Sequence, residues 1–164
     1  MHPEISAIQI RNHQRRVEID LRAVEFFSAS LIETLHLTNV TFSIVFAGTA
    51  AMRRLNRDWR GKDYATDVLS FAYEDELVEG KSFLGEIIIA PEIAVRQAIE
   101  YGVEPEMEIR KLLVHGILHL MGYDHEVDSG EMERMQKRIL RRRFFMKPPL
   151  LAPMISLSLR GRGR

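Results

Sequence analysis

Residues 105–125, PEMEIRKLLVHGILHLMGYDH, carry the clearest structural signal in the chain. Pro105 suits the first turn of a helix, and Glu106 and Glu108 favour the positive end of its dipole. Apolar residues then recur with helical spacing on one face: Ile109, Leu112, Leu113, Ile117 and Leu120. Val114 and Leu118 make the opposite side apolar as well. We therefore expect a buried helix that packs against a sheet.

Half of the six histidines of the chain lie at the end of this stretch, at positions 115, 119 and 125. His115 and His119 are four residues apart and so share one helical face. Gly122 lets the chain turn, which brings His125 back towards the first two. Three imidazoles that leave a fourth position open are typical of a catalytic zinc ion, with Ni and Cu as competitors. A lone histidine beside an apolar face is usually a core residue, but three at this spacing favour one Zn²⁺ per chain.

The spacing H-x-x-x-H-x-x-G-x-x-H is also that of the metzincin peptidases, in which a Glu after the first His acts as general base. Gly116 stands at that position here, so the group that would deprotonate water is missing. This absence disfavours a peptidase. Asp124, next to His125, either orients an imidazole as a hydrogen-bond acceptor or caps the turn, and the sequence leaves both roles open.

Periodicity predicts the remaining elements. Strands are expected over residues 5–11, 40–46, 68–71 and 85–90, the last of them central in the sheet. The acidic loop 74–80 separates the last two strands, which we expect to form a hairpin. Helices are expected from 21, after a cap at Thr49, from 91 and from 105, and a last one through about 143 after a capping box formed by Asp128 and Glu131. The order βαβαββααα predicts an α+β (mixed α/β) fold, with one mixed four-stranded sheet and about five helices. We expect one domain over 1–147 and a basic, flexible tail over 148–164.

Charge is unevenly distributed, although the formal net charge is zero. Ten of the 23 Lys and Arg residues lie in 134–164, which holds no Asp or Glu. Residues 1–133 therefore carry 13 basic and 23 acidic residues, a balance of −10. The basic segment either contacts nucleic acid or is a solvated helix face followed by a frayed end. The absence of Cys, of a signal peptide and of a membrane-length apolar run predicts a cytoplasmic protein without membrane contact.

Three blocks of the sequence resemble the YbeY family of bacterial metal-dependent endoribonucleases and rRNA maturation factors: RGKDYATDVLSF, LGEIIIA and KLLVHGILHLMGYDH. Their order and separation match the family over residues 5–145. The resemblance implies a zinc ion on His115, His119 and His125, processing of the small-subunit rRNA 3′ end, and ribosome quality control. It also places the shared arginine of the family at Arg60. The chain departs from the family at Glu86, usually Asp, and at Ala72, usually Pro; Glu86 keeps a carboxylate that could orient the site.

The chemistry expected of the residues agrees with such an enzyme. Zinc lowers the pKa of bound water towards 7 and so partly replaces the missing Glu. Arg60 can hold phosphate charge bidentately, which makes it a catalytic candidate together with His115 and His119. Arg57 and Lys62 would bind RNA phosphates, unless the loop is merely solvated. Single-stranded RNA fits a cleft better than an A-form duplex does.

Three functions remain as hypotheses. The first is a zinc-dependent, single-strand-directed endoribonuclease acting on precursor rRNA. The second is a non-catalytic ribosome-assembly factor with a structural zinc, and the third, less favoured, is a metallopeptidase. The resemblance implies rRNA, the small subunit, its ribosomal proteins and ribosome-assembly GTPases as partners, and no DNA is expected.

Overall fold

The computed structural model describes residues 8–74, 76–142 and 148–152. The element order is β1 (Ile8–Asn12), α1 (Leu21–Thr34), β2 (Val40–Phe46), α2 (Thr49–Arg60), β3 (Val68–Ala72), β4 (Leu77–Val78), β5 (Lys81–Ile89), α3 (Pro91–Tyr101), α4 (Pro105–Leu120) and α5 (Glu131–Leu140). The predicted α+β class, the five helices and the order of the long strands are confirmed. The structure has one strand more than the four predicted, because the two-residue β4 forms inside the acidic loop that joins β3 to β5.

The sheet is mixed, with the strand order β1-β2-β5-β3 and β4 paired to β5. The pairs β1–β2 and β2–β5 are parallel, whereas β3 runs antiparallel to β5, as expected of a hairpin. Ile10, Ile44 and Ile87 are aligned in register across β1, β2 and β5. Because aligned residues of neighbouring strands point to the same face, these side chains form one apolar surface for the helices.

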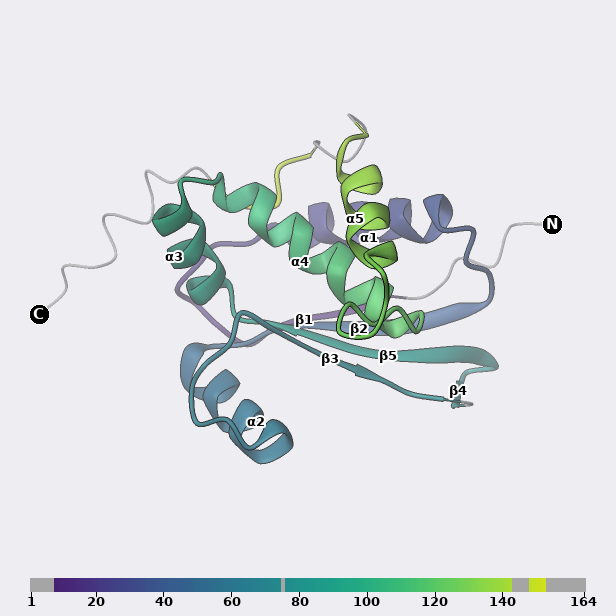
Figure 1. Cartoon of the computed structure of the whole chain (residues 1–164), viewed down its shortest axis with the longest axis horizontal. Helices are drawn as coiled ribbons and strands as arrows, with labels where there is room; N and C mark the ends of the chain where they lie inside the picture. Colours follow the sequence, from purple (N-terminus) through teal and green to yellow (C-terminus); the bar gives the residue numbers. More distant parts are fainter. Residues whose placement is uncertain (1–7, 75, 143–147, 153–164) are drawn as a thin grey trace, which may run out of the picture.

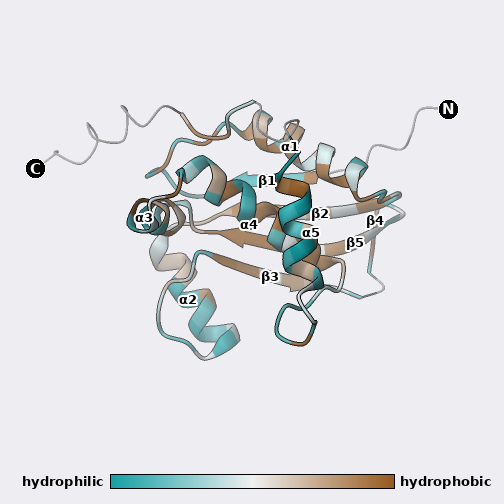
Figure 2. Ribbon diagram, turned by 45° about the horizontal axis from the view of Figure 1, so that its top comes forward, coloured by the Kyte–Doolittle hydropathy of each residue, from teal (hydrophilic) through white to brown (hydrophobic). Residues whose placement is uncertain are grey.

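Helices cover both faces of the sheet unequally. Figure 1 shows α1, α4 and α5 over one face, while α2 lies on the other face and α3 stands beside α4 at the end of the sheet. The larger core lies between the sheet and α1, α4 and α5, and α4 contributes more fully buried apolar residues to it than α5 does. The predicted burial of α4 is confirmed, since Ile109, Val114 and Leu118 are all 0% exposed. Figure 2 shows the contrast between the apolar strands and the hydrophilic α2 and α5.

Helix α5 is shorter than predicted, and its N-terminal cap differs from the predicted capping box. The Asp128 carboxylate accepts hydrogen bonds from the backbone N–H groups of Gly130 and Met132, at 2.7 and 2.9 Å. The Glu131 side chain accepts from Ser129 N at 2.6 Å rather than from Asp128. The helix ends at Leu140, and the expected end near 143 lies outside the described residues.

Residues 148–152, which the sequence assigns to a tail, pack against the domain. Leu150 is 0% exposed and Leu151 forms an isolated bridge with Ile19. The Glu106 carboxylate accepts from Leu150 N at 2.7 Å, and the buried Arg110 donates to the Pro148 carbonyl at 2.6 Å. The rest of the expected tail, 153–164, lies outside the described residues. Within the described part of the chain, no helix has the length and apolar character needed to cross a membrane.

Candidate metal centre

The last turns of α4 hold two of the three histidines. His115 and His119 lie one helical turn apart, and their Nε2 atoms are 3.1 Å from each other. Both side chains are half-buried, on the flank of the face that packs on the sheet. A helix buried on nearly all sides is a rigid support, which a metal site requires of the element that carries its ligands.

The chain reverses after α4 and brings in the third histidine. Gly122 has a φ of 97°, a left-handed conformation that glycine adopts without strain. The ring of His125 then lies 5.3 Å from the ring of His115 and 5.2 Å from that of His119, centroid to centroid. One ligand atom from each histidine falls within 4.8 Å of the others. The turn predicted at Gly122 therefore brings the three imidazoles together.

The spacing of the three nitrogens suits a tetrahedral ion. Zn–N bonds of about 2.0–2.1 Å in tetrahedral geometry separate ligand nitrogens by about 3.3 Å. The 3.1 Å between His115 and His119 is already close to that value. His125 lies on an exposed loop, so small adjustments of this loop can complete the set. The residues present thus fit a three-imidazole site that leaves a further position open to solvent.

The electrostatic surroundings favour neutral imidazoles. Burial, with the neighbouring His119 acting in the same direction, lowers the pKa of His115 to about 4. Burial also lowers the pKa of His119, with His125 acting in the same direction. A neutral imidazole is the form that binds a metal ion, so at neutral pH no proton needs to leave these two ligands.

Two contacts orient the imidazoles from outside the site. The Nδ1 atom of His115 is 3.3 Å from Oε1 of Gln136 on α5, which leaves the other ring nitrogen facing His119. A hydrogen bond with the Tyr123 backbone acts on His119 and raises its pKa against the effect of burial. Such outer partners fix the ring and the tautomer of a metal ligand. Gln136 was missed in the sequence, because it lies 21 residues from His115 and no local pattern connects them.

Asp124 accepts a hydrogen bond from Glu126 N at 2.9 Å, which is the turn-capping arrangement. Its negative charge also raises the pKa of His119, so the carboxylate lies within electrostatic range of the site. Asp67, which follows the loop after α2, raises the pKa of His115 in the same way. Asp67 belongs to the block RGKDYATDVLSF but carried no prediction of its own.

The three predicted cations, Arg57, Arg60 and Lys62, lie at the C-terminal end of α2 and in the loop that follows it. Arg60 is exposed, and its charge lowers the pKa of His119, so the guanidinium lies within range of the histidines. Arg57 forms ion pairs instead: its guanidinium lies 3.3 Å from the Asp58 carboxylate and 4.0 Å from that of Asp63. Lys62 is exposed in the same loop. Of the three predicted cations, Arg60 is the one that the structure connects electrostatically to a histidine.

Glu86 is not brought to the histidines. It alternates along β5 with Ile87, which faces Gly116 of α4. Successive side chains of a strand point to opposite faces, so Glu86 lies on the face that carries α2. Its placement gives no support to the orienting role predicted from the sequence.

Gly116 shows why this helix cannot carry a peptidase base at that position. A Cβ atom on Gly116 would lie 2.6 Å from Cγ2 and 2.9 Å from Cδ1 of Ile87. The position faces the sheet and has no space for a side chain, so a glutamate there could not reach a metal-bound water. The arrangement can instead hold a metal with an open position, and the charge of Arg60 acts within electrostatic range of its ligand His119.

Comparison with known proteins shows the family of this chain. The family model described as Endoribonuclease YbeY matches residues 9–143. An endoribonuclease YbeY of Solibacter usitatus is 43% identical over 138 residues, which cover 83% of this chain and 86% of that protein. The one of Thermodesulfovibrio yellowstonii is 35% identical over 145 residues, covering 80% and 91%. The solution structure of TM1509 from Thermotoga maritima superposes with a TM-score of 0.59 at 30% identity, covering 82% of this chain and 87% of that one. The chain therefore belongs to the endoribonuclease YbeY family.

Proposed function

We propose that this protein is a zinc-dependent endoribonuclease that cleaves single-stranded regions of precursor rRNA in the cytoplasm, acts in maturation of the small-subunit 3′ end and contributes to ribosome quality control. Membership in the family supports the coarser activity, endonucleolytic hydrolysis of RNA. The observation that carries the proposal is the convergence of three imidazole nitrogens within 4.8 Å, within electrostatic range of the guanidinium of Arg60.

Different residues would bind the ion and hold the substrate. His115, His119 and His125 would hold the metal, which when bound would supply an activated water near neutral pH. Arg60 would bind the scissile phosphate and stabilise the charge that develops on its oxygens. Gln136 would keep the ring of His115 in the orientation that metal binding needs.

The surroundings of Arg60 favour an unpaired strand. Trp59, the residue before it, is 70% exposed, and its ring edge rests on Phe71 at 5.7 Å between centroids. An exposed aromatic side chain next to a phosphate-binding cation is the arrangement on which unstacked bases stack. Bases inside an A-form duplex are not available for such stacking.

The test compares alanine variants of two site residues with an alanine variant of an exposed histidine outside the site. His115→Ala should lose zinc in a stoichiometry measurement and lose cleavage of a single-stranded precursor-rRNA fragment. Arg60→Ala should keep wild-type zinc content and lose cleavage by roughly 10²-fold or more, as expected for removal of a donor that stabilises transition-state charge. His13→Ala, which removes an exposed histidine, should behave as wild type.

The outcomes separate the proposal from its alternatives. Cleavage that persists in His115→Ala without metal would refute a catalytic metal. A wild-type protein that binds zinc and small subunits but cleaves no RNA would instead be an assembly factor with a structural ion. The proposed partners, small-subunit ribosomal proteins and ribosome-assembly GTPases, would be tested by co-purification with the wild type and the two variants.

A further inference from the structure

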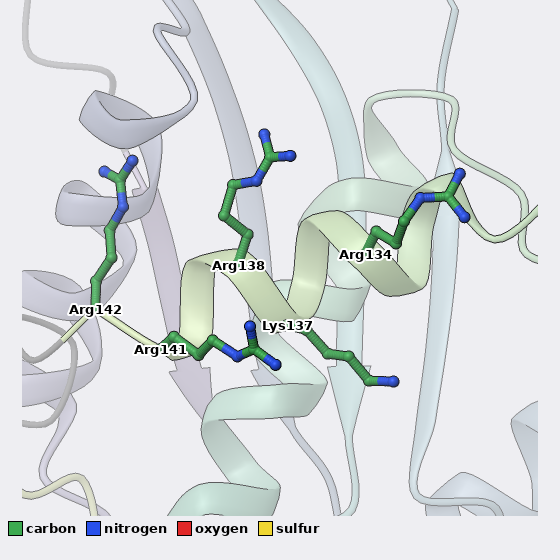
Figure 3. A pocket seen from close by; sticks show the side chains of 5 residues that line it. All are labelled: Arg134, Lys137, Arg138, Arg141 and Arg142. Atoms are coloured by element: carbon green, nitrogen blue, oxygen red, sulfur yellow. The ribbon is translucent and has the colours of Figure 1, made fainter.

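Helix α5 carries two different faces. Met132, Gln136 and Ile139 are spaced so that they share the face turned to α4, where Gln136 contacts His115. The opposite face and the segment just after the helix carry five cations that line a surface hollow of about 530 Å³: Arg134, Lys137, Arg138, Arg141 and Arg142. Figure 3 shows these five side chains extending outward from α5 and the two residues that follow it.

The cations are only partly neutralised. Arg134 lies 3.7 Å from Glu131, and Lys137 lies 2.6 Å from Glu133. Among the residues that the structure describes, no carboxylate pairs with the other three arginines, 138, 141 and 142. Residues 131–142 hold five cations against two carboxylates, a net charge of +3. A cluster of like charges on one helix face is held together at an electrostatic cost, which an anionic ligand would relieve.

Stabilisation of the helix itself explains only part of this cluster. Cations in the last turn of α5, such as Lys137 and Arg138, interact favourably with the helix dipole. Arg134 lies in the first turn, where a positive charge opposes the dipole, and Arg142 lies beyond the end of the helix at Leu140. Interaction with the helix dipole therefore does not explain why Arg134 and Arg142 belong to this cluster.

A second hollow, of about 250 Å³, adjoins the first and shares Arg138 and Arg142 with it. Its walls come from the end of α1, the turn after α4, and α5, and include Leu35, Met121, Tyr123 and Met135. An apolar pocket with an aromatic ring and two guanidinium groups at its rim matches the chemistry of a nucleotide, a flat base joined to an anionic phosphate. Tyr123 lies two residues before His125, so this pocket adjoins the loop that completes the metal centre.

We propose that the outer face of α5 and this adjoining pocket form a second RNA-binding subsite, in which Arg138, Arg141 and Arg142 hold backbone phosphates and the pocket takes one unpaired base. This inference rests on the proposed function, because it assigns the subsite to the substrate of the metal centre. The subsite anchors the strand beside the loop that carries His125 and so increases the time that the scissile phosphate spends near Arg60. Its contribution is to binding, and chemistry stays at the metal centre.

The experiment measures binding of a dye-labelled, single-stranded 12-nucleotide RNA to the metal-loaded full chain by fluorescence anisotropy. Readings are taken before cleavage, and a denaturing gel confirms that the RNA is intact. The triple variant Arg138→Gln, Arg141→Gln, Arg142→Gln should bind about tenfold more weakly at 0.1 M salt, with a salt slope smaller by about 2 for three lost phosphate contacts. Its KM for cleavage should rise by a similar factor, while kcat and zinc content stay at wild-type values.

Two matched variants control for charge and for folding. The triple variant Arg15→Gln, Arg16→Gln, Arg22→Gln removes three other exposed arginines and should keep wild-type binding and salt slope. Replacing Arg138, Arg141 and Arg142 by Lys keeps the charge and should retain most of the affinity. Thermal melting of all variants checks that α5 remains folded. Equal affinity and slope in the wild type and the α5 Gln variant would overturn the proposal, as would an equal loss in the Lys variant.

Changing the ligand tests the assignment to RNA. An abasic 12-mer of the same charge should bind the wild type more weakly than the RNA, and equal binding would overturn the placement of a base in the pocket. Vesicles containing anionic lipid should not bind in a way that depends on the three arginines; if they do while RNA binding is unchanged, the surface is a membrane contact and the proposal fails. An α5 Gln variant that binds and cleaves RNA like the wild type refutes this subsite alone. A wild type that neither binds nor cleaves RNA refutes the proposed function as well.

Discussion

Gly116 of α4 and Ile87 of β5 meet so closely that a single added carbon would collide. The Cβ atom of an alanine at 116 would lie 2.6 Å from Cγ2 of Ile87, well inside van der Waals contact. This close approach sets the distance between the helix that carries two metal ligands and the central strand beneath it. Gly116 thus leaves the position of the peptidase base without a side chain and allows α4 to pack close to the sheet.

The first prediction concerns this contact. Gly116→Ala should lower the free energy of unfolding by about 1–3 kcal/mol, because overpacking outweighs the roughly 1 kcal/mol that Ala gains over Gly within a helix. Urea denaturation measures the change. The double variant with Ile87→Ala should lose less than the sum of the two single variants, since the second change provides the missing space. A Gly116→Ala variant more stable than the wild type would contradict the contact.

A second prediction isolates the role of Gln136. Gln136→Ala removes the acceptor 3.3 Å from Nδ1 of His115 and should weaken zinc affinity about 10- to 100-fold, measured by competition with a chelator. Gln136→Glu keeps an acceptor and should retain most of the affinity. Gln97→Ala, at a half-buried position on α3, is the matched control. Unchanged zinc affinity in Gln136→Ala would mean that the contact does not orient the ligand.

The third prediction is a pH dependence of α5. Hydrogen bonds from the Met132 and Gly130 backbone hold the pKa of Asp128 below its ordinary value. A carboxylate with a lowered folded-state pKa stabilises the fold above its unfolded value of 3.8, and this contribution is lost as the pH falls below 3.8 towards the folded-state pKa. Asp128→Ala should therefore melt a few degrees below the wild type at pH 7, and the difference should shrink in strong acid. A difference in Tm that does not change with pH would exclude this mechanism.

Local patterns were sufficient for the parts of the site that lie on one element. The helical period, Pro105 and Gly122 are all found within residues 105–125, so α4, its buried face and the convergence of the three histidines followed from the sequence. The same holds for the hairpin of β3 and β5, whose strands are separated by a short acidic loop.

Features that depend on contacts between residues far apart in the sequence could not be predicted from local patterns. The face on which Glu86 lies depends on an irregularity in β5, where Thr41 pairs with Phe83 but Ser43 pairs with Glu86, so that one residue is added on β5. The contact of Gln136 with His115 requires α5 to pack against α4. No residue spacing in the sequence indicates this packing. The anchoring of Leu150 depends on Glu106, 44 residues away. Each case is a tertiary contact whose partner carries no signal in the local sequence.

A fourth prediction tests where the folded domain ends. A chain truncated after residue 147 loses Leu150 and its hydrogen bond to Glu106, and it should be destabilised by about 2–5 kcal/mol, comparable to removal of a large buried aliphatic side chain. A chain truncated after residue 152 keeps these contacts and should unfold like the full chain. Leu150→Ala in the full chain provides the matched single-residue comparison. Equal stability of the two truncated chains would place the boundary at 147, as the sequence suggested.

The last prediction uses Trp59, the only tryptophan in the sequence. Its 70% exposed side chain precedes Arg60, so a base that stacks on it while the neighbouring phosphate reaches Arg60 should quench its fluorescence. Single-stranded RNA should therefore quench the emission in a saturable way, whereas a duplex of the same length should quench it little. Trp59→Ala should weaken binding by about 1–3 kcal/mol, the value of one stacked base, and Trp59→Phe should restore part of it. Binding that leaves the emission unchanged would show that the strand enters the metal centre without passing over α2.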